Sequence, residues 1–273
     1  MQAFTDLSRL SLNQQTTQPW GVREAVEGCA RAGIPYIGLW RDKVAQHGLL
    51  ESKRIVQDAG LRISSLCRGG WFPASSAEER QSRIADNRLA IAEAAELGTE
   101  VLVLVCGPAP DRDIAAARAM VEEAIEQLLP YAAQHHVKLA IEPLHPMFAG
   151  DRSVITTLAE ANRLAAKFAS EYVGVIIDTY HVWWDPDIYT QIEQAAGHIL
   201  GFHVSDWIVP LPDVLLGRGM MGDGIIELRR LRHAVEQAGY TGPIEVEIFN
   251  QALWNRPGDE VLSLMCARFL QHV

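Results

Sequence analysis

Short runs of apolar and β-branched residues alternate with longer amphipathic segments along the whole chain. The short runs predict strands, and several of them are continuously apolar, which is typical of strands buried on both faces. Between them, apolar positions recur with a helical period, most clearly over Glu78–Leu97 and Ile114–Gln134. The eight expected strands are Leu10–Asn13, Tyr36–Trp40, Arg62–Leu66, Val101–Cys106, Lys138–Glu142, Val173–Asp178, Leu200–His203 and Ile244–Ile248.

This alternation predicts the fold class. Eight strand–helix units within 273 residues match an α/β protein built as a (β/α)8 TIM barrel. A doubly wound open sheet is the alternative, but it usually carries a glycine-rich turn after its first strand. The segment Ser11–Gln15 contains no glycine, and no linker rich in Pro, Gly or Ser interrupts the chain. We therefore expect a single domain over residues 1–273.

Composition and charge exclude several classes of protein. Hydrophobic residues make up 48% and charged residues 21%, as in ordinary globular proteins. No uncharged apolar stretch reaches the ~18 residues of a membrane helix, and the N-terminus lacks a secretory signal pattern. The net charge of -10 disfavours binding to nucleic acid or an anionic membrane. The four cysteines lie far apart without a CxxC pair, which indicates reduced thiols and a cytoplasmic location.

Titratable residues close four of the later expected strands: Glu142, Asp178, His203 and Glu247. In a barrel, these positions face the end at which the chemistry takes place. Ionised groups buried there are costly unless they are paired or bind a metal. Three carboxylates and one imidazole suit one divalent ion, and we expect Mn²⁺, with Mg²⁺, Co²⁺ or Zn²⁺ as alternatives.

The residues around these strand ends form five motifs: Ile141-Glu142-Pro143-Leu144, Asp178-Thr179-Tyr180-His181, His203-Val204-Ser205-Asp206, Arg218-Gly219 with Gly222-Asp223-Gly224, and Glu245-Val246-Glu247. These motifs resemble those of the xylose-isomerase-like TIM-barrel superfamily, which contains sugar isomerases, epimerases and endonuclease IV-type enzymes. The resemblance implies that Glu142, Asp178, His203 and Glu247 bind one divalent metal and that both glutamates also act as acid and base. It also implies that His181 and Arg218 contact the substrate.

The chemistry of such a site can be stated from the residues. Moving a carbonyl along a sugar, or inverting the carbon beside it, requires removal of a proton next to the carbonyl. A carboxylate removes this proton to leave a cis-enediolate, and the same or a second carboxylate returns it. A divalent ion stabilises the negative charge that develops on the oxygens. The expected function is therefore a metal-dependent sugar isomerase or epimerase.

Aromatic residues and the absence of one motif bear on the substrate. We expect some of Trp40, Trp71, Trp183 and Trp207 to form a wall of the pocket, because indole faces pack against sugar C–H groups. His145, three residues after Glu142, is a further candidate for the pocket lining. No glycine-rich phosphate loop is visible near the last two strands. The expected substrate is an unphosphorylated sugar or keto-sugar.

Other functions remain open at this point. A lyase or dehydratase, similar to inosose dehydratase or to enzymes that eliminate from 3-keto-glycosides, would begin with the same proton abstraction. A DNA-repair endonuclease would need further zinc ligands, but the sequence has Gly217, Gly219, Cys67 and Cys106 where the resemblance would place them. A non-catalytic sugar-binding barrel is the last alternative. The specific sugar and whether the chain forms a homo-oligomer are left open.

Overall fold

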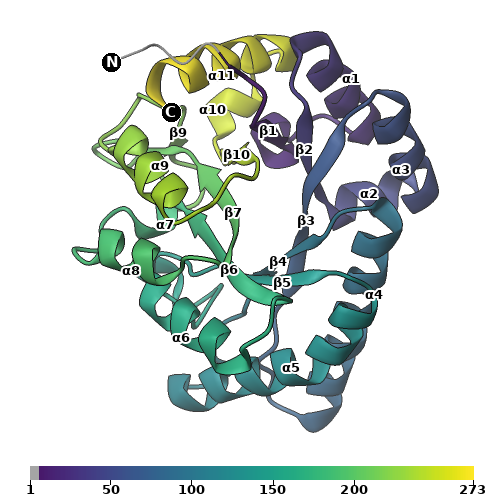
Figure 1. Ribbon diagram of the computed structural model, residues 1–273, viewed down its shortest axis with the longest axis vertical. Coiled ribbons are helices and arrows are strands. Elements are labelled where there is room, and N and C mark those ends of the chain that lie inside the picture. The colour runs from purple at the N-terminus through teal and green to yellow at the C-terminus, as the bar shows by residue number, and fades with distance from the viewer. Residues whose placement is uncertain (1–5) are drawn as a thin grey trace.

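Eight parallel strands close into a barrel in the computed structural model, which describes residues 6–273 (Figure 1). Their order around the barrel is β1-β10-β7-β6-β5-β4-β3-β2, and β2 pairs with β1 to close it. The expected (β/α)8 TIM barrel is therefore confirmed. The first five residues of the expected domain lie outside the described residues. They include the start of the N-terminal segment for which the sequence predicts no secretory signal. The strands are β1 (Leu10–Asn13), β2 (Tyr36–Trp40), β3 (Arg62–Gly70), β4 (Val101–Val105), β5 (Lys138–Ile141), β6 (Val173–Asp178), β7 (Ile199–Val204) and β10 (Ile244–Val246).

Helices surround the barrel as an outer ring (Figure 1). Ser76 caps the long helix after β3 by accepting a hydrogen bond from Glu79 N, which gives this helix the start that its Ser-Ser-Ala-Glu-Glu sequence favours. A short antiparallel pair, β8 (Asp206–Trp207) and β9 (Arg218–Gly219), follows β7. The helices are η1 (Gln14–Thr17), α1 (Val22–Ala32), α2 (Arg41–His47), α3 (Leu49–Asp58), α4 (Ala77–Leu97), α5 (Ile114–Gln134), η2 (Pro146–Phe148), α6 (Leu158–Phe168), α7 (Thr179–Val182), α8 (Ile188–Gln194), α9 (Leu228–Gln237), α10 (Gln251–Trp254) and α11 (Gly258–His272).

The strand limits differ from the sequence prediction mainly at β3. This strand continues past Leu66 to Gly70, with an irregularity between Cys67 and Gly69. Gly70 has φ of 100°, and a Cβ there would lie 2.0 Å from the carbonyl oxygen of Val105. Glycine therefore allows β3 to run close beside β4. The strand continues in this way past Leu66, where the sequence prediction ended it.

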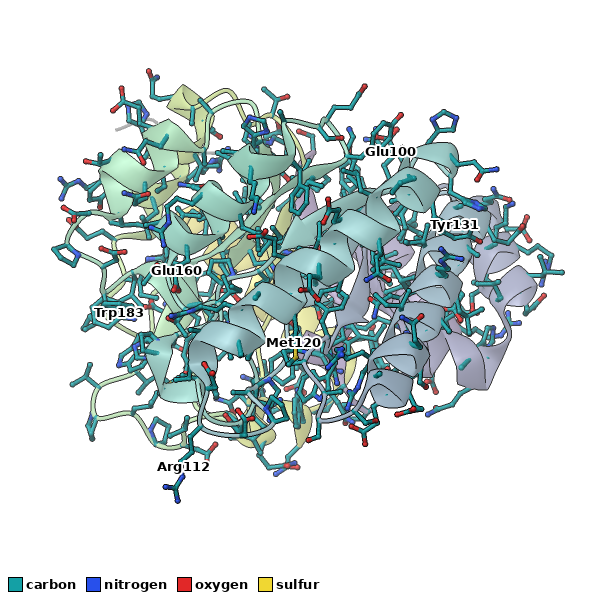
Figure 2. All side chains as sticks on the ribbon, turned by 90° about the horizontal axis from the view of Figure 1, so that it is seen from below. Glu100, Arg112, Met120, Tyr131, Glu160 and Trp183 are labelled. Atoms are coloured by element: carbon teal, nitrogen blue, oxygen red, sulfur yellow. The ribbon has the colours of Figure 1, made fainter. Side chains whose placement is uncertain are left out.

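Apolar side chains fill both sides of the barrel wall. Cys67, Val103, Ala140 and Ile176 form a layer inside the barrel, whereas the main core lies between the strands and the helices. Because the strands are parallel, their carboxyl ends all lie at one end of the barrel, which we call the barrel mouth. Figure 2 shows Glu100, which precedes β4, and Arg112, which follows it, at opposite edges of the molecule. Within residues 6–273, no helix is long and apolar enough to cross a membrane.

Candidate metal centre

Glu142, Asp178, His203 and Glu247 come together at the carboxyl ends of their strands. Each offers one ligand atom, these atoms lie within 4.8 Å of one another, and all four residues are buried. Asp178 and His203 are register partners on β6 and β7. Glu142 and Glu247 directly follow β5 and β10, and their backbone N–H groups donate to the carbonyl oxygens of Leu104 and Val204. The barrel register therefore aims all four side chains at one point.

Two atoms of this cluster lack a hydrogen-bond partner. Glu142 Oε1 and His203 Nδ1 are buried and make no hydrogen bond with any described residue. Burial of an unpartnered carboxylate oxygen and imidazole nitrogen is costly, and a divalent cation between them would satisfy both. Three carboxylates and one imidazole are ligands suited to such an ion. In the part of the chain that the structure describes, this is the one group of His, Cys, Asp and Glu side chains close enough to hold a metal.

Arg218 contributes a positive charge to the cluster. Its Nη1 lies 2.9 Å from Asp178 Oδ2 and 3.0 Å from Glu247 Oε2, and the side chain is buried. The β8–β9 pair and a hydrogen bond from Arg218 N to the carbonyl oxygen of Phe249 fix its backbone. Arg218 forms no ion pair with the nearby Asp223 of the same motif, because Asp223 pairs with Arg268.

Burial and charge shift the pKa values of these carboxyls in different directions. Burial raises the pKa of Glu142, and it raises the pKa of Asp178 to about 7 although Arg218 acts in the opposite direction. Burial also acts to raise the pKa of Glu247, but Arg218 and His203 outweigh it and lower the pKa to about 2. The cluster therefore holds its negative charge unevenly, with Glu247 the most firmly ionised of these three carboxyls.

A fourth buried carboxylate, Glu245, lies beside His203. Glu245 Oε1 lies 4.0 Å from His203 Nε2, on the ring side away from Glu142. Asn13, Ser64 and Ser65 all donate hydrogen bonds to Glu245, and Asn13 also donates to Glu247 at 3.1 Å. Such a partner orients a metal-binding histidine and sets which nitrogen faces the ion.

Sequence reasoning did not assign this role to Glu245. The signal was present, because residues two apart on a strand share a face and Glu247 was already placed inward. Gly38 makes room for the carboxylate: a Cβ there would lie 2.1 Å from Glu245 Oε1.

A cavity of about 150 Å³ opens above the cluster. Glu142, Glu247, His181 and Arg218 line it, so the acid–base and substrate-contact candidates face one space. Burial, with Arg218 adding to it, lowers the pKa of His181 well below the usual value, which keeps the ring neutral. Aromatic side chains form the walls, among them the expected Trp40 and Trp71, and Phe148 and Phe249 as residues that were not expected.

Three other candidates lie outside this lining. The His145 ring packs 5.1 Å from Trp207, and Trp207 packs 5.4 Å from Trp183. The Trp207 ring also packs 4.9 Å from the Tyr180 ring, and the His145 ring packs 5.5 Å from the Trp184 ring. His145 still bears on the site through its backbone N–H, which donates to His181 Nδ1 at 3.2 Å. Direct contact of these three side chains with substrate stays a prediction.

Comparison with known proteins agrees with this architecture. Residues 26–266 match the sequence profile of the family described as xylose isomerase-like TIM barrel. The chain belongs to this family. The resemblance drawn from the strand-end motifs is therefore confirmed, and the match spans most of the barrel.

Three known proteins show how far the likeness extends. A protein of known crystal structure from Sinorhizobium meliloti 1021 is 48% identical, with a TM-score of 0.96 over 98% of this chain and 99% of that one. L-ribulose-5-phosphate 3-epimerase UlaE from Salmonella paratyphi A is 24% identical over 216 residues, which are 76% of this chain and 71% of that protein. The IolI protein, crystallised with a bound zinc atom, is 18% identical with a TM-score of 0.85 over 97% and 98% of the chains, and shows the fold alone. The epimerase activity for which UlaE is named supports an enzyme of the sugar isomerase and epimerase type, as expected.

Proposed function

We propose that this protein is a divalent-metal-dependent isomerase or epimerase of an unphosphorylated sugar or keto-sugar, acting through a cis-enediolate. One observation carries the proposal: Glu142 and Glu247 belong to the four-residue ligand cluster and also line the cavity above it. A substrate in this cavity would therefore meet two carboxylates and the metal position together. Mn²⁺ is the proposed ion, and the cytoplasm is the proposed location.

In this proposal, Glu142 and Glu247 act as acid and base. Each lies within the reach of a bound polyol, so one carboxylate removes the proton next to the carbonyl and either one returns it. Arg218 and His181 hold the substrate oxygens, with Arg218 as a fixed hydrogen-bond donor beside the developing negative charge. When bound by Glu142, Asp178, His203 and Glu247, a divalent ion would supply electrophilic stabilisation of the substrate oxygens.

The walls of the cavity serve binding and water exclusion. Trp40 donates its indole N–H to Asn13 at 2.9 Å, which fixes the ring plane and leaves its face toward the cavity. Trp71 also lines this cavity. Aromatic faces of this kind pack against the C–H groups of a sugar ring or chain. His145, Trp183 and Trp207 are proposed to support the mouth of the site.

The experiment that tests this function follows protons rather than product. The Mn²⁺-loaded protein is incubated with neutral ketoses in D₂O, and ¹H NMR detects deuterium on the carbon next to the carbonyl. We expect exchange that Glu247→Gln abolishes. Turnover without solvent exchange would indicate a hydride shift, and loss of a β substituent would indicate the lyase alternative; either result contradicts the proposal.

A further inference from the structure

Two arginines on the cavity wall have no close carboxylate partner. Arg68, near the end of β3, and Arg152, after η2, line the same cavity as Glu142 and Glu247. Arg68 forms no hydrogen bond or ion pair with any residue of the range 6–273, and its guanidinium stacks 4.3 Å from the Trp71 ring centre. Arg152 has only a loose contact of 3.9 Å with the exposed Asp151, and its buried Nε has no hydrogen-bond partner among the described residues.

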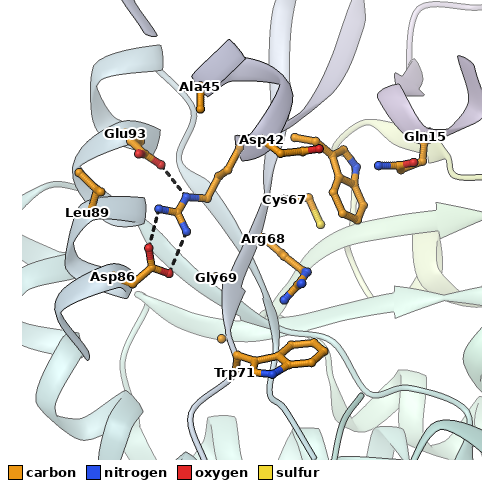
Figure 3. Close-up of a pocket in the computed structure, with 13 residues that line it drawn as sticks. Gln15, Asp42, Ala45, Cys67, Arg68, Gly69, Trp71, Asp86, Leu89 and Glu93 are labelled. Carbon is orange, nitrogen blue, oxygen red and sulfur yellow. Dashed lines mark hydrogen bonds and ion pairs between the residues drawn. The ribbon is translucent and has the colours of Figure 1, made fainter. Parts of the chain in front are cut away.

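The neighbouring Arg41 shows that an arginine near this site can have carboxylate partners. Arg68 also lines a wider groove of about 650 Å³ that shares Trp40, Cys67 and Trp71 with the cavity. In that groove, Arg41 is bound by Asp86 and Glu93, as the dashed lines in Figure 3 show, whereas Arg68 lies against Trp71 and forms no hydrogen bond or ion pair in the described chain. Asp42 lines the groove too and its charge favours the Arg68 cation from a distance, but no ion pair joins the two within residues 6–273.

The electrostatic surroundings of Arg68 also favour an anion. Burial lowers the pKa of Arg68 from its usual value, and the positive charge of Arg152 acts in the same direction. Two partly buried cations close to one another are unfavourable unless an anion lies between or beside them. The Trp71 ring, 4.3 Å from the Arg68 guanidinium, restricts the motion of this side chain, and a guanidinium offers a fork of N–H donors that matches the oxygens of a carboxylate or phosphate. The overall charge of -10 would otherwise repel an anionic ligand.

We propose that Arg68 and Arg152 bind an oxyanion carried by the substrate itself, so that the substrate is an acidic sugar. The proposal rests on the proposed function for the place of the reacting carbons beside Glu142 and Glu247. A carboxylate and a phosphate share the chemistry that an arginine pair recognises. A carboxylate agrees with the absence of a glycine-rich phosphate loop, and a phosphate would correct the expectation of an unphosphorylated substrate.

Three ketoses that differ at one terminal group provide the probe. D-fructose, D-fructuronate and D-fructose 6-phosphate carry a hydroxymethyl group, a carboxylate and a phosphate ester at the end remote from the ketone. D-tagatose, D-tagaturonate and D-tagatose 6-phosphate repeat the comparison with a different configuration. Binding to the Mn²⁺-loaded protein is measured by calorimetry, and deuterium exchange is measured separately by NMR.

The variants are Arg68→Gln and Arg152→Gln, with Arg68→Lys as a conservative replacement. Arg112→Gln is the matched control, because Arg112 is exposed on the loop after β4 and projects away from the molecule (Figure 2). We expect one anionic ketose to bind at least about 10-fold more tightly than its neutral counterpart. Each Gln variant should lose about 10- to 100-fold of that affinity, as for a lost charged hydrogen bond, and should bind the neutral ketose within about twofold of the original.

The two readouts separate this inference from the proposed function. Preference for the uronate identifies a sugar acid, and preference for the phosphate ester identifies a sugar phosphate. Arginine-dependent binding without deuterium exchange would support the oxyanion site but contradict the proposed isomerase or epimerase function. The inference is overturned if no anionic ketose binds more tightly than its neutral form, or if Arg68→Gln and Arg152→Gln weaken both forms equally. Melting curves and Arg68→Lys distinguish a lost contact from a misfolded variant.

Discussion

His203 Nδ1 lies 3.4 Å from Glu142 Oε1, and neither atom makes a hydrogen bond with any described residue. Both atoms are buried at the mouth of the barrel. They attract each other when the imidazole is protonated, and a divalent cation in place of that proton would bind both atoms. This relationship, more than the number of carboxylates, is the physical reason to expect metal at this position.

Metal removal should therefore stop catalysis. We expect exhaustive chelation to abolish deuterium exchange, and Mn²⁺, Co²⁺ or Mg²⁺ to restore part of it. Ligand binding to the folded state alone also stabilises a protein, so the melting temperature should fall on chelation and recover on metal addition. Full turnover by protein shown to be metal-free by elemental analysis would contradict the assignment.

Replacement of either acid–base glutamate should slow deuterium exchange strongly and change the free energy of unfolding less. We expect Glu247→Gln to reduce deuterium exchange by at least about 10²-fold, the scale of a lost general base. Glu142→Gln should behave similarly. The measurement is exchange at saturating metal, so that weaker metal binding does not account for the loss. A variant that keeps its full rate would exclude that glutamate from proton transfer.

Glu245 should act as a positioning residue. Because it lies 4.0 Å from His203 Nε2, Glu245→Gln should weaken metal binding by about 10- to 100-fold, as is typical for partners that orient a metal ligand. Added metal should rescue most of the rate, which a purely structural defect would not allow. Ser64→Ala, which removes one of the hydrogen bonds to Glu245, is expected to have a smaller effect of the same kind.

Gly38 should be intolerant of a side chain. A Cβ at this position would lie 2.1 Å from Glu245 Oε1, so Gly38→Ala forces the buried carboxylate to move. We expect a loss of about 1–3 kcal/mol in the free energy of unfolding, together with weaker metal binding. Gly150→Ala is the control, since a Cβ added at Gly150 would meet no described atom within 4 Å. Equal melting temperatures for the two variants would contradict this account.

The chain should hold one metal and should not cut DNA. Cys67 and Cys106, which stand where an endonuclease would have further ligands, are buried, and burial raises the pKa of both thiols. Neither belongs to the ligand cluster. We expect one tightly bound ion per chain by elemental analysis and no incision of an abasic duplex at low salt. Three zinc ions with efficient incision would overturn the sugar-enzyme proposal.

The sequence by itself predicted the barrel and the four residues that meet at its centre. Continuous apolar strands alternating with amphipathic helices have few stable arrangements, and a (β/α)8 barrel is the one that fits eight units. Glu142, Asp178, His203 and Glu247 were recognisable because each ends an apolar run, and parallel strands bring their carboxyl ends to one edge. These are local patterns, so they are visible in one dimension.

The tertiary structure alone decided which other residues face that centre. Arg218 reaches Asp178 and Glu247 because the β8–β9 pair folds a long loop back over the barrel. Trp40 and Trp71 line the cavity, whereas Trp183 and Trp207 pack against each other, although all four had equal standing in the sequence. Arg68 and Arg152 lie on different βα units, and their lack of partners depends on what surrounds them in space. Contacts between distant segments depend on register and loop path, which hydrophobic periodicity does not encode.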